Sequence, residues 1–228
     1  MTATTFGRYA DLPALVGFMT GDEKHQAAAE STLDVLWVLY DRVLNVTPET
    51  LDDPDRDRFL LSKGHGPAAY YAVLAAKGFL GVRELRAWGA FDSPLGHHPD
   101  RVLVPGVEIG SGSLGHGLGL ALGTALALRA QGRTRPRVVA LVGDAELDEG
   151  SNHEAIAVAG RLGIDNLTVV VIDNQSDSLG WPGGIGERFA VEGWDARAVE
   201  GRDHAALYEA LTTAHPGRPL AVTARVRS

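Results

Sequence analysis

Residues 137–173 read RVVALVGDAELDEGSNHEAIAVAGRLGIDNLTVVVID, and this stretch decides the fold. Two nearly continuous apolar runs, 137–143 and 167–173, flank a segment with helical spacing at 149–163. Apolar residues at successive positions are typical of strands that are covered on both faces. A strand, a helix and a second strand at this spacing predict neighbouring parallel strands joined by a right-handed crossover.

The same alternation extends toward both ends of the chain. We expect further strands at 59–62, 196–200 and 220–226, and helices at 26–44, 67–79, 81–89, 112–132 and 204–211. Residues 1–24 show no clear period and are expected to form an N-terminal arm, followed by one domain over residues 25–228. The fold class that follows is α/β, with a doubly wound, mainly parallel sheet flanked by helices.

Composition argues against several classes of function. The chain has 228 residues, a formal net charge of −8 and no cysteine. The negative charge argues against a nucleic-acid-binding or anionic-membrane surface, so we expect neither partner. Without cysteine, disulfides and thiolate chemistry are excluded. The N-terminal stretch lacks the pattern of a signal peptide, and no apolar run approaches the roughly 20 residues that span a bilayer. We therefore expect a cytoplasmic protein.

Each of the two apolar runs in the opening stretch is followed by a side chain that offers an oxygen atom. Asp144 follows the first run, and Asn174 follows the second. Ligands of open parallel sheets bind beyond the carboxyl ends of the strands, where these oxygens would lie close together. A carboxylate and an amide oxygen suit Mg²⁺ or Ca²⁺, with phosphate oxygens or water completing the shell. Each residue alone is more simply explained as a turn cap, but the pair favours an ion.

A glycine-rich segment, GSGSLGHG at 110–117, opens a predicted helix. Such helix starts present N–H groups to anions and let a ligand approach the backbone closely. The segment lacks the lysine of a P-loop, so a Walker-type nucleotide site is not expected. Close packing between helices explains the glycines equally well, and this motif alone is a weak signal.

Five of the eight histidines lie beside predicted loops or helix starts: His25, His65, His97, His98 and His116. A single histidine in such a place is usually structural. Several together can bind a hydroxyl-rich substrate and move protons near neutral pH. Their spacing matches no zinc-binding pattern.

Taken together and in this order, the segments resemble the N-terminal, diphosphate-binding part of transketolases, which depend on thiamine diphosphate. The resemblance rests on SKGHG (62–66), GHHPDR (96–101), PGVEIGSGSLGHGLGLALG (105–123), GDAELDEGSNHEA (143–155), NLTVVVIDNQ (166–175) and ERFAVEGWDARAVEGRD (187–203). It covers nearly the whole chain from about His25 onward. It implies a bound thiamine diphosphate with Mg²⁺ or Ca²⁺, and transfer of a two-carbon ketol unit from a ketose to an aldehyde.

The resemblance also implies a role for each matching residue. Asp144 and Asn174 match the metal-ligating side chains, and the carbonyl of Ser176 matches a third protein ligand. Gly112 and Leu114 match residues that line the aminopyrimidine ring. The implied cofactor-binding residues are Gly112, Ser113, Leu114, Gly143, Asp144, Ala145, Glu149 and Asn174.

The implied catalytic residues are His25, His65 and His98, which match histidines that face the ketose and its reacting hydroxyls. His97 is the less well aligned neighbour of His98. Three other positions depart from the family pattern: Ala145 replaces a glycine, His116 a glutamine and Arg202 a histidine.

The chain stops at RVRS, where the family continues into further active-site segments. We therefore expect the pyrimidine-binding and C-terminal domains of the family to be absent from this chain. The resemblance therefore implies one subunit of a split transketolase, active only with a separate C-terminal subunit that carries the pyrimidine-binding domain. We expect a heterotetramer acting on a sugar or sugar phosphate. Two alternatives stay open: a related enzyme that passes its unit to a carrier-protein or lipoyl thiol, and a non-catalytic subunit that only holds the cofactor.

Overall fold

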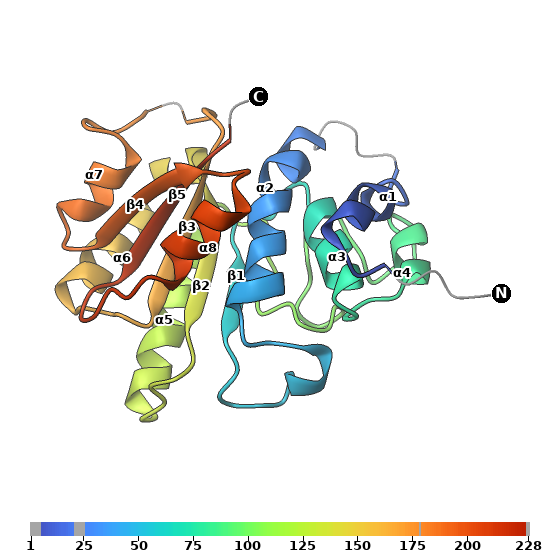
Figure 1. Ribbon diagram of the computed structural model, residues 1–228, viewed down its shortest axis with the longest axis horizontal. Coiled ribbons are helices and arrows are strands. Elements are labelled where there is room, and N and C mark those ends of the chain that lie inside the picture. Colours follow the sequence, from blue (N-terminus) through green and yellow to red (C-terminus); the bar gives the residue numbers. More distant parts are fainter. Residues whose placement is uncertain (1–5, 21–25, 178, 227–228) are drawn as a thin grey trace.

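A five-stranded sheet forms the centre of the molecule (Figure 1). The computed structural model describes residues 6–20, 26–177 and 179–226. The strands are β1 (Arg58–Leu61), β2 (Val138–Gly143), β3 (Leu167–Asp173), β4 (Asp195–Glu200) and β5 (Leu220–Arg225). Their order across the sheet is β1-β2-β3-β5-β4, and every neighbouring pair is parallel. The expected α/β class with a doubly wound parallel sheet is confirmed.

Alternate residues of the central strands enter two separate cores. On β2, Val139 and Leu141 belong to one core, whereas Val138, Ala140 and Val142 belong to the other. All residues of β2 are buried. Because successive side chains of a strand point to opposite faces, a strand covered on both sides needs an unbroken apolar run. The apolar run at 138–143 is unbroken because β2 is covered on both faces.

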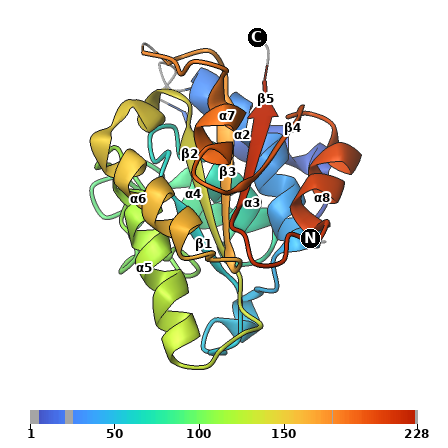
Figure 2. The ribbon, with the colours of Figure 1, turned by 90° about the vertical axis from the view of Figure 1, so that its left-hand side faces the viewer.

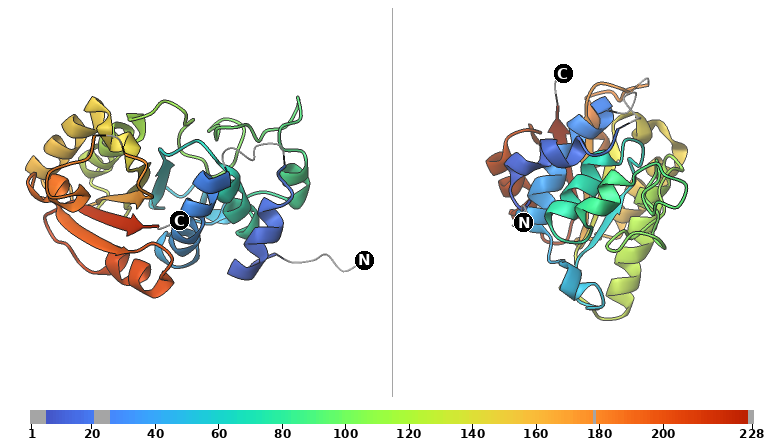
Figure 3. Two further views of the ribbon diagram at one scale, coloured as in Figure 1. Left: turned by 90° about the horizontal axis from the view of Figure 1, so that it is seen from above. Right: turned by 90° about the vertical axis from the view of Figure 1, so that its right-hand side faces the viewer.

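Helices cover both faces of the sheet (Figure 2). The first core includes α1 (Leu12–Val16), α2 (Gln26–Val38), α3 (Ala68–Ala76), α4 (Val82–Arg86) and α8 (His204–Thr212). The second includes α5 (His116–Ala130), α6 (Gly150–Arg161) and α7 (Ile185–Ala190). Figure 3 shows α1 and α4 at one end of the molecule, away from α7. Among the described helices, none is long and apolar enough to cross a membrane.

Two helices differ from the sequence expectation for local reasons. α5 begins later than the expected residue 112, because Gly112 and Gly115 have φ values of 132° and 84°. Backbone of this kind favours glycine and does not continue into a helix. α7 has six residues and was not expected at all. Helices this short are stabilised by tertiary packing, here through buried Phe189, and not by propensity.

Residues 1–24 include a folded segment. Within this range, α1 buries Leu12 and Leu15 completely in the first core. A five-residue helix shows too few turns for its apolar spacing to be recognised in the sequence.

The carboxyl ends of all five strands meet at one edge of the sheet, because every pair is parallel. Gly143, at the end of β2, pairs with Ile172 of β3. Asp144 and Asn174 therefore follow neighbouring strands, as the sequence predicted. The segment 62–66 follows β1 at the same edge.

Gly160, in the last turn of α6, packs against the backbone ahead of β4. A Cβ atom at this position would lie 1.8 Å from the carbonyl oxygen of Glu192. We predict that Gly160→Ala lowers the free energy of unfolding by about 1–3 kcal/mol, measured by chemical denaturation, because the helix must move away. Gly186→Ala in α7 is the control, since nothing lies within 4 Å of its Cβ position. The control should change stability by no more than about 1 kcal/mol, and equal losses in both variants would contradict this packing.

Candidate active site

The glycine-rich turn at 110–117 is the place where the motif segments meet. A Cβ atom at Gly64 would lie 2.5 Å from the Ser111 hydroxyl oxygen, and one at Gly117 would lie 2.2 Å from the Ser62 side chain. Approaches this close are possible only without a side chain. The segment that follows β1 therefore rests directly on the turn.

Two further segments contact the same turn. A Cβ atom at Gly112 would lie 3.1 Å from the His98 ring. One at Gly115 would lie 2.6 Å from the Glu149 side chain, and the Ser151 hydroxyl donates to the Gly115 carbonyl at 2.8 Å. The turn thus joins residues from the loop before α5 with the start of α6.

The buried carboxylate of Glu146 ties the turn to the ends of two strands. This residue is 2% exposed. It accepts hydrogen bonds from the Ser62 hydroxyl, from the Gly115 amide at 3.0 Å and from the Gly143 amide at 3.3 Å. The Ser62 hydroxyl oxygen in turn accepts from the Gly117 amide at 3.0 Å. One carboxylate thereby fixes the end of β1, the end of β2 and the start of α5.

A buried lysine lies near this carboxylate. The Lys63 ammonium donates to the Ser31 hydroxyl at 3.0 Å and to the Ala28 carbonyl at 3.3 Å. Burial lowers the pKa of Lys63 to about 8, although the charges of Asp144 and Glu146 act to raise it. Burial likewise raises the pKa of Glu146. The lysine links the first turns of α2 to the edge of the sheet.

Asp144 and Asn174 converge as the sequence predicted, and Ser176 joins them. The Ser176 hydroxyl oxygen lies within hydrogen-bond distance of Oδ1 of Asp144 and of Oδ1 of Asn174, the latter at 2.8 Å, and donates its one proton to either oxygen. The Ser176 amide donates to the other oxygen of Asp144 at 2.8 Å. Asp144 is 2% exposed and also accepts from the Ala145 amide at 2.8 Å. The two oxygens therefore point at one shared position.

The backbone at this position is in an unusual conformation. Gln175, between Asn174 and Ser176, has a φ of 61° and is the one non-glycine residue with a positive φ in the described part of the chain. Strained residues of this kind cluster at functional sites, where the surrounding structure holds them in place. Here the strain accompanies the turn that brings Asn174 and Ser176 to Asp144.

The donor set fits a hard divalent cation with a phosphate ligand. Ions of this class prefer carboxylate, amide and carbonyl oxygens, and they complete the shell with phosphate or water. Two side-chain oxygens already converge on the Ser176 hydroxyl. No group of three His, Cys, Asp or Glu side chains suitable for a metal occurs among the described residues. The candidate site therefore depends on an acid together with neutral oxygen ligands.

The predicted histidines are not all brought together. His98 lies beside Gly112, whereas the His97 ring contacts Trp88, with ring centres 5.1 Å apart. His65 is exposed and follows β1 at the carboxyl edge. His25 lies outside the described residues.

The remaining predicted cofactor residues line the same region. Gly143 is buried at the end of β2, and Ala145 is half-buried at the start of a 3-10 helix (Ala145–Asp148). Ser113 and Glu149 are exposed, and Leu114 is 46% exposed. Their roles remain predictions.

Sequence reasoning missed the residues that assemble the site. Glu146 is one of five acidic residues at 144–154, and nothing in their pattern marks it as buried. Ser62 and Lys63 lie in a recognised motif, yet only the fold brings them to Glu146. An available signal was the placement of Glu146 three residues after a strand end.

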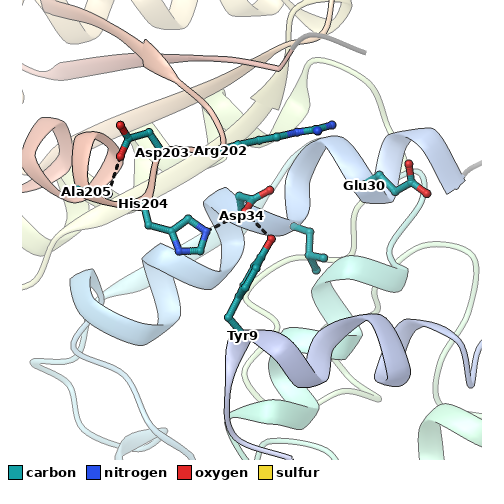
Figure 4. A pocket seen from close by; sticks show the side chains of 8 residues that line it. Tyr9, Glu30, Asp34, Arg202, Asp203, His204 and Ala205 are labelled. Atoms are coloured by element: carbon teal, nitrogen blue, oxygen red, sulfur yellow. Dashed lines mark hydrogen bonds and ion pairs between the residues drawn. The ribbon is translucent and has the colours of Figure 1, made fainter.

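A groove of about 900 Å³ opens beside α2 and α8 (Figure 4). The Asp34 carboxylate accepts from the Tyr9 hydroxyl at 2.6 Å and lies 2.8 Å from the His204 ring nitrogen. Burial raises the pKa of Tyr9 to about 12, so the phenol remains a donor. Arg202, a departure from the family pattern, lines this groove. The cluster holds the segment before α1 against α2 and α8.

The lowered pKa of Lys63 leads to a prediction about stability. Between about pH 8 and the ordinary lysine pKa of 10.5, folded Lys63 loses a proton that the unfolded chain retains. The unfolded state then binds more protons, so the free energy of unfolding rises with pH, by up to about 1.4 kcal/mol per unit. Urea denaturation of the metal-free protein from pH 7 to 9.5 should show wild type gaining stability relative to Lys63→Met. Lys77→Met, at an ion pair with Asp41, is the control, and an equal gain relative to both variants would refute the assignment.

Comparison with known proteins places this geometry in a family. The model of the transketolase, thiamine diphosphate binding domain matches residues 19–226. "Ferredoxin fas2" of Rhodococcoides fascians is 59% identical over 218 residues, which cover 96% of this chain and 72% of that protein. An apulose-4-phosphate transketolase subunit of Actinobacillus succinogenes is 36% identical over 207 residues, which cover 88% of this chain and 75% of that protein.

A solved structure shows the same fold. The transketolase from Campylobacter jejuni superposes with a TM-score of 0.77 at 23% identity, covering 99% of this chain and 38% of that chain. This chain therefore spans well under half the length of that transketolase. On the family match and on these relatives, the chain belongs to the transketolase family through its thiamine diphosphate-binding domain.

Proposed function

We propose that this chain is the cofactor-binding subunit of a two-component transketolase that transfers a two-carbon ketol unit from a ketose or ketose phosphate to an acceptor. One observation carries the proposal. The oxygens of Asp144 and Asn174 converge at the edge of the sheet where the glycine-rich turn also lies. A divalent cation there lets an acidic chain hold a diphosphate group.

Each group of residues has a proposed task in holding the cofactor. Asp144, Asn174 and Ser176 would hold Mg²⁺, and the ion would bind the diphosphate. Gly112 and Leu114 in the turn would line the aminopyrimidine ring. When bound, thiamine diphosphate supplies the nucleophilic carbon and the electron sink for ketol transfer. Glu146 acts indirectly, because its carboxylate holds the turn and the strand ends in fixed relation.

The histidines are the proposed proton-transfer groups of this chain. His98 lies beside Gly112, and both His98 and His65 are exposed toward solvent. A neutral imidazole can accept a proton from a substrate hydroxyl, and an imidazolium can return it. His25 is proposed for the same surface on the resemblance alone.

A second chain is proposed to cover this surface. Leu114 is 46% exposed, and His65, His98 and Glu149 are exposed as well. Reactive carbon chemistry of this kind requires exclusion of water, which an open edge does not provide. The name of the Actinobacillus relative describes one subunit of a transketolase, which supports a partner that carries the rest of the enzyme.

The outer face of α5 and α6 is proposed as the contact with a second copy of this chain. Leu120, Leu126, Val158 and Leu162 are between 36% and 53% exposed. A Cβ atom at Gly119 or Gly123 would meet nothing within 4 Å, so this face permits close approach. Apolar patches of this kind mark interaction sites, and two-fold symmetry is the commonest arrangement of copies. Two copies with two partners give a heterotetramer.

The name of the Rhodococcoides relative does not carry over to this chain. Iron–sulfur clusters of ferredoxins are held by cysteine thiolates. This chain contains no cysteine.

The proposed metal site predicts the effect of removing one carboxylate. Asp144→Ala should weaken Mg²⁺-dependent binding of thiamine diphosphate by at least about tenfold, because the ion loses its only charged protein ligand. Titration calorimetry with thiamine diphosphate and MgCl₂ measures this, on the chain alone and in complex with a partner. Asp52→Ala, an exposed loop residue, is the matched control and should bind as wild type does. Unchanged binding by Asp144→Ala would place the metal elsewhere.

The proposed division between two chains predicts that activity depends on mixing. The purified chain should show no ketol transfer with ketose phosphate donors and aldehyde acceptors, because the cofactor-activating domain lies in the partner. Addition of a separately produced pyrimidine-domain subunit should restore transfer, and the complex should contain two copies of each chain by light scattering. Full activity of the isolated chain would refute the proposal. Transfer only to a lipoyl or carrier-protein thiol would favour the related enzyme class instead.

A further inference from the structure

Arg188 on α7 is a buried cation, and two of its donor atoms have no acceptor among the described residues. The residue is 5% exposed. Its Nε and Nη2 atoms are buried and have no hydrogen-bond partner in the described part of the chain. Buried charged donors are almost always paired in folded proteins, because an unmet donor has lost its water without replacement. An unmet pair of donors therefore points to a binding partner outside this chain.

The described side chains around Arg188 do not supply acceptors for its Nε and Nη2 atoms. The guanidinium lies 5.2 Å from the centre of the Trp181 ring, which offers a face but no acceptor oxygen. Asp148 is the acidic group whose charge is felt by both Arg188 and His153. Its carboxylate accepts instead from the Leu179 amide at 3.3 Å. Asp148 therefore offsets part of the charge without binding Nε or Nη2.

The two unmet donors have the geometry of an oxyanion receptor. Nε and Nη2 lie along one edge of the guanidinium plane, and this edge binds two oxygens of a carboxylate or phosphate side by side. The Trp181 ring forms one wall, and the His153 ring lies beyond it, with ring centres 5.7 Å apart. A second group that can become cationic, His153, thus stands near the same place.

The segment that carries Trp181 is partly exposed and is built from residues that can rearrange. Trp181 is 37% exposed and Leu179 is 77% exposed. Gly180, Gly183 and Gly184 have φ values of 65°, 85° and 87°. A loop with three such glycines has fewer steric barriers to a change in backbone path than one with side chains. Movement of Trp181 would open space beside the guanidinium of Arg188.

We propose that Arg188 anchors an oxyanion-binding site beneath Trp181, which takes a phosphate or carboxylate group on its Nε–Nη2 edge. The site goes beyond the proposed cofactor function, since none of the residues expected to bind thiamine diphosphate or Mg²⁺ belongs to it. The oxyanion has two possible sources, a free small anion or a carboxylate side chain of a partner protein. The test has one arm for each.

The first arm titrates the full chain with inorganic phosphate and, separately, with sodium acetate at constant ionic strength. Histidine NMR signals report the result through the pKa of His153. Burial lowers this pKa most, and the charge of Arg188 lowers it further. An anion on Arg188 should raise that pKa in a saturable way. Tryptophan fluorescence should change with the same midpoint, since the Trp181 ring lies against the guanidinium.

Two variants of Arg188 separate recognition from structure. Arg188→Lys keeps the charge and most of the stem but removes the bidentate edge, and should weaken anion binding at least tenfold with the fold intact. Arg188→Met removes the charge and should abolish the His153 response without lowering the midpoint of thermal unfolding. Arg83→Met on α4 is the matched control, exposed and at the opposite end of the molecule (Figure 1), and should respond as wild type does.

The second arm measures assembly with the partner chain and rests on the proposed function. If the carboxylate comes from that partner, Arg188→Lys should weaken the complex at least tenfold, and Arg83→Met should not. Absence of any complex with the wild-type chain would count against the proposed function, and the first arm would then decide this site. The inference is overturned if no Arg188-dependent response occurs in either arm, or if Arg188→Met unfolds at a markedly lower temperature and Arg188→Lys binds as wild type does.

Discussion

The buried carboxylate of Glu146 is the interaction on which the rest of this site depends. It accepts hydrogen bonds from the Ser62 hydroxyl and from the amides of Gly115 and Gly143. These donors belong to the end of β1, the start of α5 and the end of β2. A carboxylate that is removed from water needs such donors, because desolvation disfavours its charge. The hydrogen bonds that the carboxylate needs therefore hold the end of β1, the end of β2 and the start of α5 in one arrangement.

Two buried acidic residues and one buried lysine lie at the carboxyl edge of the sheet. Glu146 and Asp144 are both nearly inaccessible to solvent, and Lys63 is the buried cation whose pKa responds to both of them. The lysine in turn is bonded to Ser31 and Ala28 of α2. Charge compensation and helix placement are thus achieved by the same side chain. The helix α2 is joined in this way to the segment that follows β1.

The glycines of this site allow neighbouring segments to approach closely, because they have no side chain. Gly64, Gly112, Gly115 and Gly117 each permit a contact that a Cβ atom would close. Because the turn is rich in glycine, it has few apolar side chains of its own to pack. The segments that contact it therefore set its position. The exposed residues at the edge, with Leu114 among them, leave a surface that is ordered but open. An open, pre-arranged surface is what a subunit needs if another chain is to complete its active site.

The site also shows how the opening stretch of acidic residues divides into separate tasks. Asp144 points toward Asn174 through Ser176, and Glu146 turns inward to the strand ends. Asp148 accepts from the Leu179 amide and lies near Arg188. Glu149 packs its stem beside Gly115 and remains exposed. Four acidic residues within six positions therefore face four different surroundings, although their chemistry is nearly the same.

The sequence by itself determined the parallel α/β fold and the meeting of Asp144 with Asn174. Unbroken apolar runs can be satisfied only by strands buried on both faces, and parallel strands must end at a common edge. Tertiary structure alone decided that Glu146 and Lys63 are buried, that α5 begins only after Gly115, and that α7 forms. Burial depends on which segments pack together across 84 residues, as between Ser62 and Glu146. Short helices and turn conformations depend on the same long-range contacts, and no local pattern of residues encodes them.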